Sequence, residues 1–270
     1  MNKDTGASDP LRSVRRTTAL LRLLSTHMAT GWRLTDLAQA AGLHHSTVHR
    51  LVSGMVEERL AARVGGSMRY TLGPMAHEIG LAARSYFEPP APVAERLAGL
   101  AAHTRDIVFL SIRSGNDSVC IGRWDGQRAL KAYTVEVGTR RALSLSAGGA
   151  AILAGLRRAE RESVVAANLE AIALRGEAQA AVQRMLARSV RLGYGYNRED
   201  IIPGIAALGV PFGLAGRPVG ALSIGTSAAN LAEDRRSRLL ALMRGEAGVL
   251  AAAFAQSRYV ESPRQGSAKN

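Results

Sequence analysis

The sequence predicts an α+β protein of two domains, a small helical domain followed by a larger one built on an antiparallel sheet. Two observations support this prediction. Apolar side chains recur at helical spacing from Val14 to Glu58, and beyond residue 94 short β-branched runs alternate with Ala-rich helical stretches. Between the two regions, the stretch EPPAP at 88–92 ends any helix, because successive prolines cannot continue one. We therefore place the domain boundary there.

Two helices are predicted at the start of the small domain, which we assign to residues 12–73. The first runs from Val14, with arginines between its apolar positions, and ends between residues 28 and 31. The second is short. We expect Thr35 to cap its beginning and Gly42 to end it in the left-handed conformation, which glycine adopts without steric cost.

A third helix is predicted at residues 45–58, and a hairpin follows it. The helix has four apolar residues on one face at helical spacing: Val48, Leu51, Val52 and Met55. The runs LAARV and MRYTL flank a Gly65–Gly66 pair, a pattern typical of two strands joined by a tight turn. Helix, helix, turn, helix and hairpin is the element order of a winged helix-turn-helix.

A connecting helix at residues 74–90 leads into the larger domain, which we assign to residues 91–258. A helix at 94–104 precedes three predicted strands, IVFLSIRS, SVCIGRWD and ALKAYTVEVG. After them come helices at 145–156 and 158–192, the strands IAALGVPF and GRPVGALSIG, and a last helix at about 231–256. An antiparallel sheet with flanking helices fits this order.

The composition narrows the class of protein. The formal net charge is +13, and residues 12–72 hold nine arginines against three acidic residues, which favours a polyanionic partner. The single cysteine, Cys120, excludes an internal disulfide framework, and we expect it to be buried packing rather than a sensor. No apolar run is long enough to cross a membrane, and MNKDTGASDP lacks the apolar core of a secretion signal. These features predict a cytoplasmic protein with no membrane partner and with disordered tails at 1–11 and 259–270.

The third helix carries the strongest functional signal. A recognition helix packs one face on its own domain and presents polar side chains to the major groove from its first turns. Six polar residues meet that description: His44, His45, Ser46, Thr47, His49 and Arg50. Arg33 before the second helix and Arg69 on the hairpin, with Arg63 as a further candidate, complete the expected contacts to double-stranded operator DNA.

Other interpretations of these residues stay open. His45 and His49 lie four apart, a spacing that zinc can use, but no carboxylate or cysteine nearby completes a ligand set, so no metal and no cofactor is expected. The polar residues could instead be solvated or bind a protein partner, and a DNA-binding protein without a ligand is a further alternative. An enzyme is disfavoured, because no G-x-S-x-G motif surrounds Ser144 or Ser146 and five of the six histidines lie in the N-terminal third.

From residue 12 to about 256 the chain resembles the IclR family of bacterial transcriptional regulators. Three stretches carry the resemblance: SVRRTTALLRLL with LTDLAQAAGLHHSTVHRLVSGMVEERLAAR and RYTLGPMAHEIG, then VGTRRALSLSAGGAAILAGL, then LGYGYNREDIIPGIAALGVPF with GRPVGALSIGTSA. The resemblance implies a homodimer or homotetramer that acts as a repressor or an activator. Each subunit would join a winged helix-turn-helix to a GAF-like domain that binds a small molecule, often an organic or aromatic acid.

The resemblance also implies an effector pocket with seven candidate residues: Ser146, Gly148, Gly149, Ala150, Asp200, Ala207 and Ser223. Family members commonly carry Gly-Lys where this chain has Gly149–Ala150, and often a cysteine where it has Ala207. These apolar replacements point to a larger or more apolar ligand, or to a weak pocket. From the residues alone, AGGAA at a helix start suits either a carboxylate or close packing, and Asp200 suits a cap or a surface pair better than a ligand contact.

Overall fold

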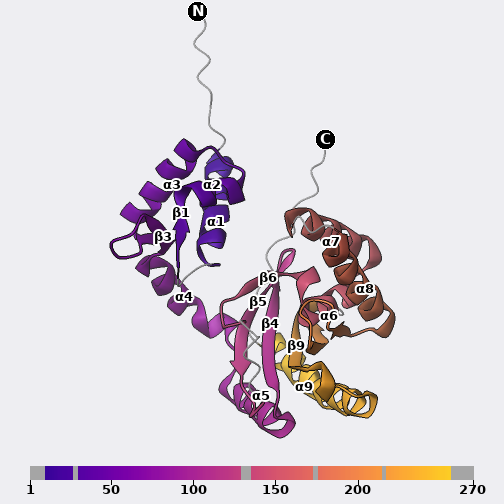
Figure 1. Cartoon of the computed structure of the whole chain (residues 1–270). Coiled ribbons are helices and arrows are strands. Elements are labelled where there is room, and N and C mark those ends of the chain that lie inside the picture. The colour runs from indigo at the N-terminus through magenta and orange to yellow at the C-terminus, as the bar shows by residue number, and fades with distance from the viewer. Residues whose placement is uncertain (1–9, 27–29, 129–134, 173–175, 215–216, 257–270) are drawn as a thin grey trace, which may run out of the picture. The chain divides into compact units, whose positions relative to one another are not determined.

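The computed structural model describes residues 10–26, 30–128, 135–172, 176–214 and 217–256. The chain divides into two units within one helix, α4 (Pro74–Phe87), with the first unit ending at Ser85 and the second beginning at Tyr86 (Figure 1). Both units combine helices with antiparallel strands, so the predicted α+β class is confirmed. The division falls a few residues before the prolines that mark the boundary in the sequence.

The N-terminal unit is a winged helix-turn-helix. Its elements are α1 (Pro10–Leu24), β1 (Trp32–Arg33), α2 (Leu34–Ala41), α3 (His45–Glu57), β2 (Ala61–Arg63), β3 (Arg69–Leu72) and the first part of α4 (Pro74–Phe87). The strands pair antiparallel in the order β1-β3-β2. Leu20 and Leu37, from α1 and α2, are fully buried and belong to one cluster with Val48 and Val52 of α3. This cluster is the core of the unit.

Local details of this unit differ from the sequence-based expectation. α1 begins at Pro10, inside the segment expected to be a disordered tail. Arg33 and not Thr35 occupies the cap position of α2, and the Thr35 hydroxyl donates instead to the Asp36 carboxylate at 3.1 Å. Gly42 ends α2 with φ +62°, as predicted. The two-residue strand β1 is too short to show a periodicity in the sequence.

The C-terminal unit is built on a six-stranded antiparallel sheet in the order β6-β5-β4-β9-β8-β7. The strands are β4 (Ile107–Ser114), β5 (Asp117–Trp124), β6 (Arg140–Ala142), β7 (Gly195–Arg198), β8 (Ile205–Leu214) and β9 (Arg217–Ser227). The helices are α5 (Ala91–Thr104), α6 (Ala147–Gly155), α7 (Arg158–Ile172), α8 (Gly176–Leu192) and α9 (Glu233–Gln256). Short 3-10 turns, Leu143–Leu145 and Ala228–Asn230, precede α6 and α9.

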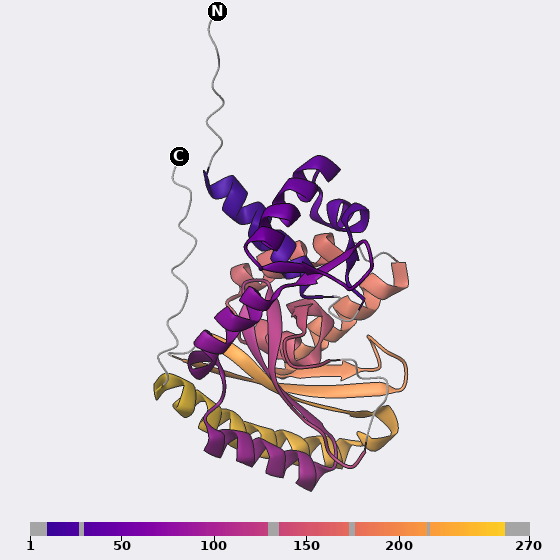
Figure 2. The same ribbon diagram turned by 90° about the vertical axis from the view of Figure 1, so that its left-hand side faces the viewer.

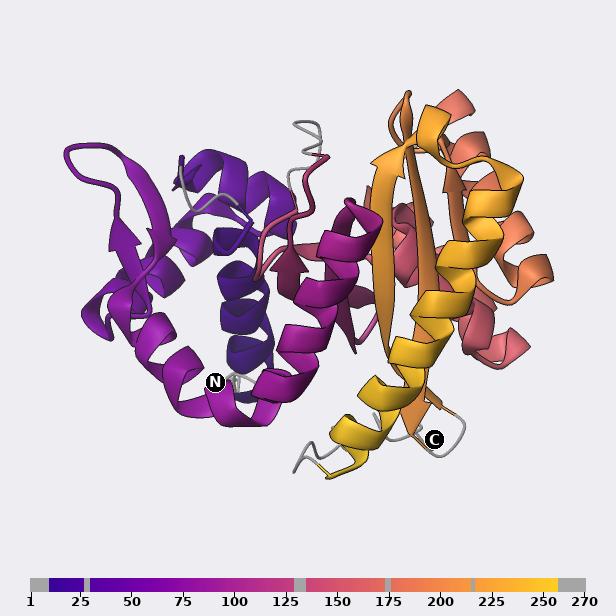
Figure 3. The ribbon, with the colours of Figure 1, turned by 90° about the horizontal axis from the view of Figure 1, so that it is seen from below.

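The sheet separates two apolar layers. Val108, Leu208 and Leu222 belong to the cluster formed with α5 and α9, which lie side by side over one face of the sheet (Figure 2). On the opposite face, α6 and α8 form a second cluster around Ile152 and Met185 (Figure 3). Because successive side chains of a strand point to opposite faces, each central strand contributes to both layers.

Two glycines let α6 approach the sheet closely. A side chain at Gly195 would place its Cβ atom 1.8 Å from the Ala147 carbonyl oxygen, and one at Gly209 would come within 2.3 Å of the same atom. The two glycines are register partners on β7 and β8. The start of α6 therefore rests directly on the sheet backbone, which glycine at both positions permits.

One predicted strand is not where the sequence placed it. Of the stretch ALKAYTVEVG, residues 129–134 lie outside the described part of the chain, and residues 135–138 form a loop with a turn. The edge strand follows at Arg140–Ala142 and pairs with β5. β7 is also unexpected, because the sequence GYNR has neither the length nor the alternation of a strand signal. The tail expected at 259–270 lies outside the described residues.

Candidate functional site

Helix α3 has one buried and one polar face. Val48 and Val52 are almost inaccessible to solvent. The polar residues predicted to contact DNA occupy the start of the helix; Thr47 is half-buried, and the others are exposed: His44, His45, Ser46, His49 and Arg50. This division follows from the 3.6-residue period, which brings positions 48 and 52 to the same side. The structure thus gathers these six side chains around the first turns of one helix.

The turn before α3 leaves backbone donors at the start of the helix. The Leu43 amide donates to the Ala38 carbonyl oxygen at 3.0 Å, which helps to close the end of α2. His44 then precedes α3 in an extended conformation, and its side chain forms no cap hydrogen bond. The first amides of an α-helix have no partner within the helix and lie at the positive end of its dipole. Such a helix start suits a phosphate group.

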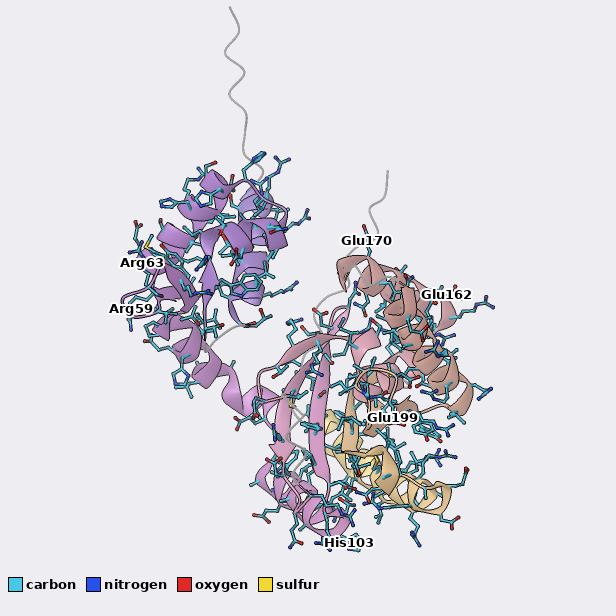
Figure 4. All side chains as sticks on the ribbon, viewed as in Figure 1. Arg59, Arg63, His103, Glu162, Glu170 and Glu199 are labelled. Carbon is cyan, nitrogen blue, oxygen red and sulfur yellow. The ribbon has the colours of Figure 1, made fainter. Side chains whose placement is uncertain are left out.

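The arginines of the wing, the hairpin formed by β2 and β3, are engaged within the unit. The Nε group of Arg63, labelled in Figure 4, donates to the Tyr70 hydroxyl at 3.1 Å, and the guanidinium carbon lies 5.5 Å from the centre of the Tyr70 ring. Arg69 is half-buried, and its Nη1 group donates to the Gly31 carbonyl oxygen at 3.0 Å. Arg33 is exposed. Both wing arginines therefore already donate hydrogen bonds within the unit, which the sequence did not predict.

The described residues contain no group of three or more His, Cys, Asp or Glu side chains placed to hold a metal ion. His45 and His49, the pair with zinc spacing, are both exposed on α3. Among the described helices, none combines the length and the apolar character that crossing a bilayer requires.

A cavity of about 70 Å³ lies between the sheet and the start of α6 in the C-terminal unit. This space is several times the roughly 10–15 Å³ that one buried water needs. The alternation of the strands explains its wall. Val108 and Leu222 face α5 and α9, so their neighbours Phe109 and Ser223 point to the opposite face, where they are register partners and line the cavity.

The lining combines apolar side chains, hydroxyl groups and, among the described residues, one charged side chain. The apolar part includes Phe109, Leu145, Ile201, Ile202 and Ile205. Hydroxyl groups come from Ser111, Ser118, Thr139, Ser146 and Ser223. Asn197 adds an amide, and Arg141 on β6 adds the charge. Such a surface suits a ligand with an apolar body and one anionic or strongly polar group.

Cys120 also lines this cavity, as a neutral thiol. The residue is 3% exposed, and burial raises the pKa of the thiol to about 11. Its Sγ group donates to the Gly122 carbonyl oxygen at 3.3 Å. Since the thiolate is the reactive form of cysteine, the structure favours the packing role expected from the sequence over a sensor role.

Four of the seven predicted pocket residues line the cavity: Ser146, Gly148, Ala207 and Ser223. They come from three elements, because Ala207 lies on β8 and Ser223 on β9, while the other two belong to the start of α6. A Cβ atom at Gly148 would lie 3.3 Å from the Ser223 hydroxyl oxygen, so the absence of a side chain there leaves room beside that hydroxyl. The Ser146 hydroxyl accepts from the Gly149 amide at 3.0 Å and caps α6.

The other three predicted residues, Gly149, Ala150 and Asp200, do not line this cavity, and their contact with an effector stays a prediction. Gly149 faces the Leu143 carbonyl oxygen, which would lie 2.1 Å from a Cβ atom at this position. Ala150 is fully buried in the apolar cluster of α6 and α8. The alanine at this position, where family members commonly have lysine, therefore does not remove a charge from the wall of this cavity. Asp200 is paired with the Arg188 guanidinium, the structural role that its residue type favours. The step of about 100° between successive helical residues turns Gly149 away from Gly148, whereas Ala150 lies one turn further along α6 than Ala147, in the apolar cluster rather than at the cavity.

Reasoning from the sequence missed Arg141 and most of the apolar wall. Arg141 lies in the stretch VGTRRALS, but no motif distinguishes it from its neighbour Arg140, which forms an ion pair with Asp117. Phe109 could have been found, because the alternation in IVFLSIRS puts positions 107, 109 and 111 on one face. Residues 201–205 belong to a segment without periodicity, so their direction depends on the fold.

Two family models match the chain. Residues 13–65 match the IclR helix-turn-helix domain. Residues 91–251 match the C-terminal domain of the bacterial transcriptional regulator IclR, and this match alone spans more than half of the chain.

Curated relatives span most of the chain. It is 27% identical over 206 residues to the HTH-type transcriptional regulator KipR of Bacillus subtilis, which covers 75% of this chain and 81% of the relative. It is 25% identical over 240 residues to the HTH-type transcriptional regulator KdgR of Dickeya chrysanthemi, which covers 87% of this chain and 77% of the relative.

Solved structures share the fold. An IclR family transcriptional regulator from Brucella abortus aligns with a TM-score of 0.74 at 18% identity, over 90% of this chain and 92% of that one. An IclR homologue from Microbacterium hydrocarbonoxydans, solved in complex with 4-hydroxybenzoate, aligns with a TM-score of 0.61 at 20% identity, over 91% of this chain and 100% of that one.

Proposed function

This chain belongs to the IclR family of bacterial transcriptional regulators, and on that basis we propose what each of its two units binds. Family membership makes it a DNA-binding transcriptional regulator with a C-terminal effector-binding domain, and not an enzyme. We propose that the polar face of α3 contacts double-stranded operator DNA. The cavity beside α6 then binds a small organic effector that changes the affinity of this contact.

The two-faced arrangement of α3 is the observation that supports the DNA contact. Its apolar residues are buried, and its polar residues crowd the first turns, where helix-turn-helix proteins meet base edges and phosphates. Arg50 can pair with a phosphate or with the O6 and N7 atoms of guanine, and Ser46 suits a phosphate oxygen. Because Arg63 and Arg69 donate hydrogen bonds within the unit, we expect α3 to supply more of the affinity than the wing.

Selection of bound genomic fragments with the full-length chain, followed by affinity measurements at several salt concentrations, tests this assignment. Arg50→Ala is expected to weaken operator binding about five- to 150-fold, the cost of losing one such contact (about 1–3 kcal/mol). Arg244→Ala removes an exposed charge from α9 and is the control, expected to retain the affinity of the unmodified chain. An unchanged affinity of the Arg50→Ala protein would contradict the recognition-helix assignment.

The lining of the cavity supports an effector with an apolar body and an anionic group, that is, an organic acid. Arg141 supplies positive charge, and the wall includes Ala147 and Gly148 at the positive end of the α6 dipole. Phe109 and Ile201 supply the apolar surface. The homologue from Microbacterium hydrocarbonoxydans, solved with the aromatic acid 4-hydroxybenzoate, is in keeping with this ligand class.

Thermal-shift screening of the full-length chain against aromatic and aliphatic carboxylic acids tests the effector class. An acid that binds only the native state must raise the melting temperature by mass action. The same acid is expected to change operator affinity, because binding at coupled sites is reciprocal. The amide of each stabilising acid is the matched control, since it keeps the shape and loses the charge. Equal stabilisation by acid and amide would contradict an anion-binding cavity.

We further propose that the chain acts as a homodimer or homotetramer. Exposed apolar side chains on α1 and α4, among them Val14, Ile79 and Leu81, leave apolar surface that a second copy would bury. Light scattering of the full-length chain over a range of concentrations measures the assembly. A monomer throughout that range would contradict the proposal.

A further inference from the structure

A second hollow lies on the opposite face of the sheet from the effector cavity. It is a groove of about 460 Å³ between the end of α5 and the first turns of α9, with Arg128 of the β5–β6 connection at its side. His103, labelled at the end of α5 in Figure 4, marks its position. α5 and α9 cover one face of the sheet and α6 the other, and no residue lines both hollows. Whatever the groove binds is therefore separate from the effector.

The groove is strongly cationic. Its lining contains four arginines and a histidine and no carboxylate among the described residues: His103, Arg105, Arg128, Arg235 and Arg238. The nearest acid with a contact to them is Asp106, which is 1% exposed beneath the groove. Its Oδ2 atom accepts from the Arg235 guanidinium at 2.5 Å, and its Oδ1 atom accepts from the Thr226 hydroxyl at 2.9 Å. One carboxylate balances one of the four arginines, and three positive charges remain.

Three of these guanidinium groups keep donors without a hydrogen-bond acceptor. The Nη1 atom of Arg128 is buried, has no hydrogen-bond partner, and stands 3.6 Å from Asp106 Oδ1. Arg105 and Arg238 are exposed, and within the described part of the chain their side chains form no ion pair or hydrogen bond. Asp234, one turn before Arg238 on α9, forms no ion pair with it. An anion in the groove would accept hydrogen bonds from guanidinium groups that have no acceptor within the described part of the chain.

The backbone holds two of the arginines in place at a conformational cost. Arg105 ends α5 with φ +63°, a left-handed conformation that usually selects glycine at a helix end. The Arg128 amide donates to the Arg105 carbonyl oxygen at 2.8 Å. Gly126 permits this approach, because a Cβ atom there would lie 2.3 Å from the Arg105 carbonyl carbon. The chain thus has an arginine at a left-handed position that glycine would occupy at a lower cost in free energy. A backbone hydrogen bond joins a second arginine, Arg128, to this position.

We propose that this groove binds a small molecule that carries a dianionic phosphoryl group. The planar guanidinium presents paired donors that match phosphate geometry, and a dianion with three terminal oxygens can accept from several of them at once. The volume is within the range of small-molecule sites. Leu242, which is 40% exposed, and Leu239 supply an apolar surface beside the charges. The ligand therefore combines a phosphoryl group with an apolar part.

Calorimetric titration of the full-length chain with phenyl phosphate and with inorganic phosphate tests the proposal. Phenyl phosphate is expected to bind more tightly, because its ring covers Leu242, and phenol is expected not to bind. Arg238→Gln should weaken phenyl phosphate at least about tenfold, in line with the loss of a charge-assisted hydrogen bond. Arg244→Gln removes an exposed charge from the same helix outside the groove and should change nothing. Arg141→Gln should also leave this affinity unchanged, since Arg141 lines only the other cavity.

Arg105→Gly separates ligand binding from structure. Glycine relieves the left-handed backbone, so the melting temperature should not fall, while phenyl phosphate affinity should fall as for Arg238→Gln. Absence of phenyl phosphate binding, or equal losses in Arg238→Gln and Arg244→Gln, would overturn the proposal. So would an Arg238→Gln protein that binds phenyl phosphate normally but has changed its oligomeric state or its affinity for non-operator duplex DNA. Neither titration involves the operator, so a negative result concerns the groove alone.

Discussion

The polar face of α3 and the cavity beside α6 are assembled from the chain in different ways. The face comes from residues 44–50, so its members are neighbours in the sequence as well as in space. The cavity collects side chains as distant as Phe109 and Ser223, which only the register of β4 and β9 brings together. A local surface can lose one side chain and keep its shape, whereas a cavity depends on the packing of every element around it. The two sites should therefore respond differently to substitution.

The largest expected effect is on the packing that shapes the cavity. Gly195→Ala should lower the free energy of unfolding of the C-terminal unit by about 1–3 kcal/mol or more, because the new Cβ atom would lie 1.8 Å from the Ala147 carbonyl oxygen. Chemical denaturation followed by circular dichroism measures this change. Gly245→Ala on α9 is the control, since an added Cβ there meets nothing within 4 Å, and it should be neutral or stabilising by up to about 1 kcal/mol. Equal stabilities would show that α6 has room to move.

The next effect concerns the chemistry of the cavity wall. Burial raises the pKa of the Cys120 thiol to about 11, so alkylation by iodoacetamide at pH 8 should be on the order of a hundredfold slower in the native than in the unfolded chain. The native rate should rise with pH up to that pKa. The thiol ionises at a lower pH in the unfolded chain than in the folded one, so the raised pKa stabilises the folded state at pH values below the unfolded pKa. This stabilisation is lost as the pH rises toward 11. Equal labelling rates would instead indicate an accessible thiolate.

A smaller effect should separate ligand binding from DNA binding. Arg141→Gln is expected to weaken the binding of a stabilising carboxylic acid about tenfold or more, since a hydrogen bond to a charged group contributes about 1.5–3 kcal/mol. Operator affinity without the acid should stay unchanged. Calorimetry and operator titration measure the two quantities, with Arg191→Gln, an exposed arginine on α8, as the control. A parallel loss of both affinities would mean that Arg141 supports the fold rather than the ligand.

The smallest effect is expected on the recognition face itself. Ser46→Ala should weaken operator binding by about 1 kcal/mol, or roughly fivefold, if its hydroxyl donates to a phosphate oxygen. Stability should not fall, because Ser46 is exposed and alanine is a good helix former. Fluorescence anisotropy with the selected operator measures the change. An unaltered affinity would place the first turn of α3 away from the phosphate backbone.

The sequence anticipated most elements, and its errors share a physical cause. Apolar periodicity located α3, and the glycine at position 42 marked the end of α2. Thr35 failed as a cap because α2 begins two residues earlier than a Thr35 cap requires, directly after β1 ends at Arg33. Arg69 stays a predicted contact to the DNA backbone, and the sequence did not indicate that its Nη1 group donates to the Gly31 carbonyl oxygen. Both details depend on contacts with another segment of the chain, and a local pattern does not contain that information.

By itself, the sequence determined most of the elements and the two faces of α3, because periodicity, turn residues and charge density are properties of short stretches. The family followed from the three stretches that resemble IclR regulators. Only the tertiary structure decided which of the small residues around 146–150 face the cavity and that Asp200 pairs with Arg188. It also brought Arg105 and Arg235, far apart in the chain, to one groove. These outcomes depend on strand register and on packing between distant segments, whose free energies no single segment carries.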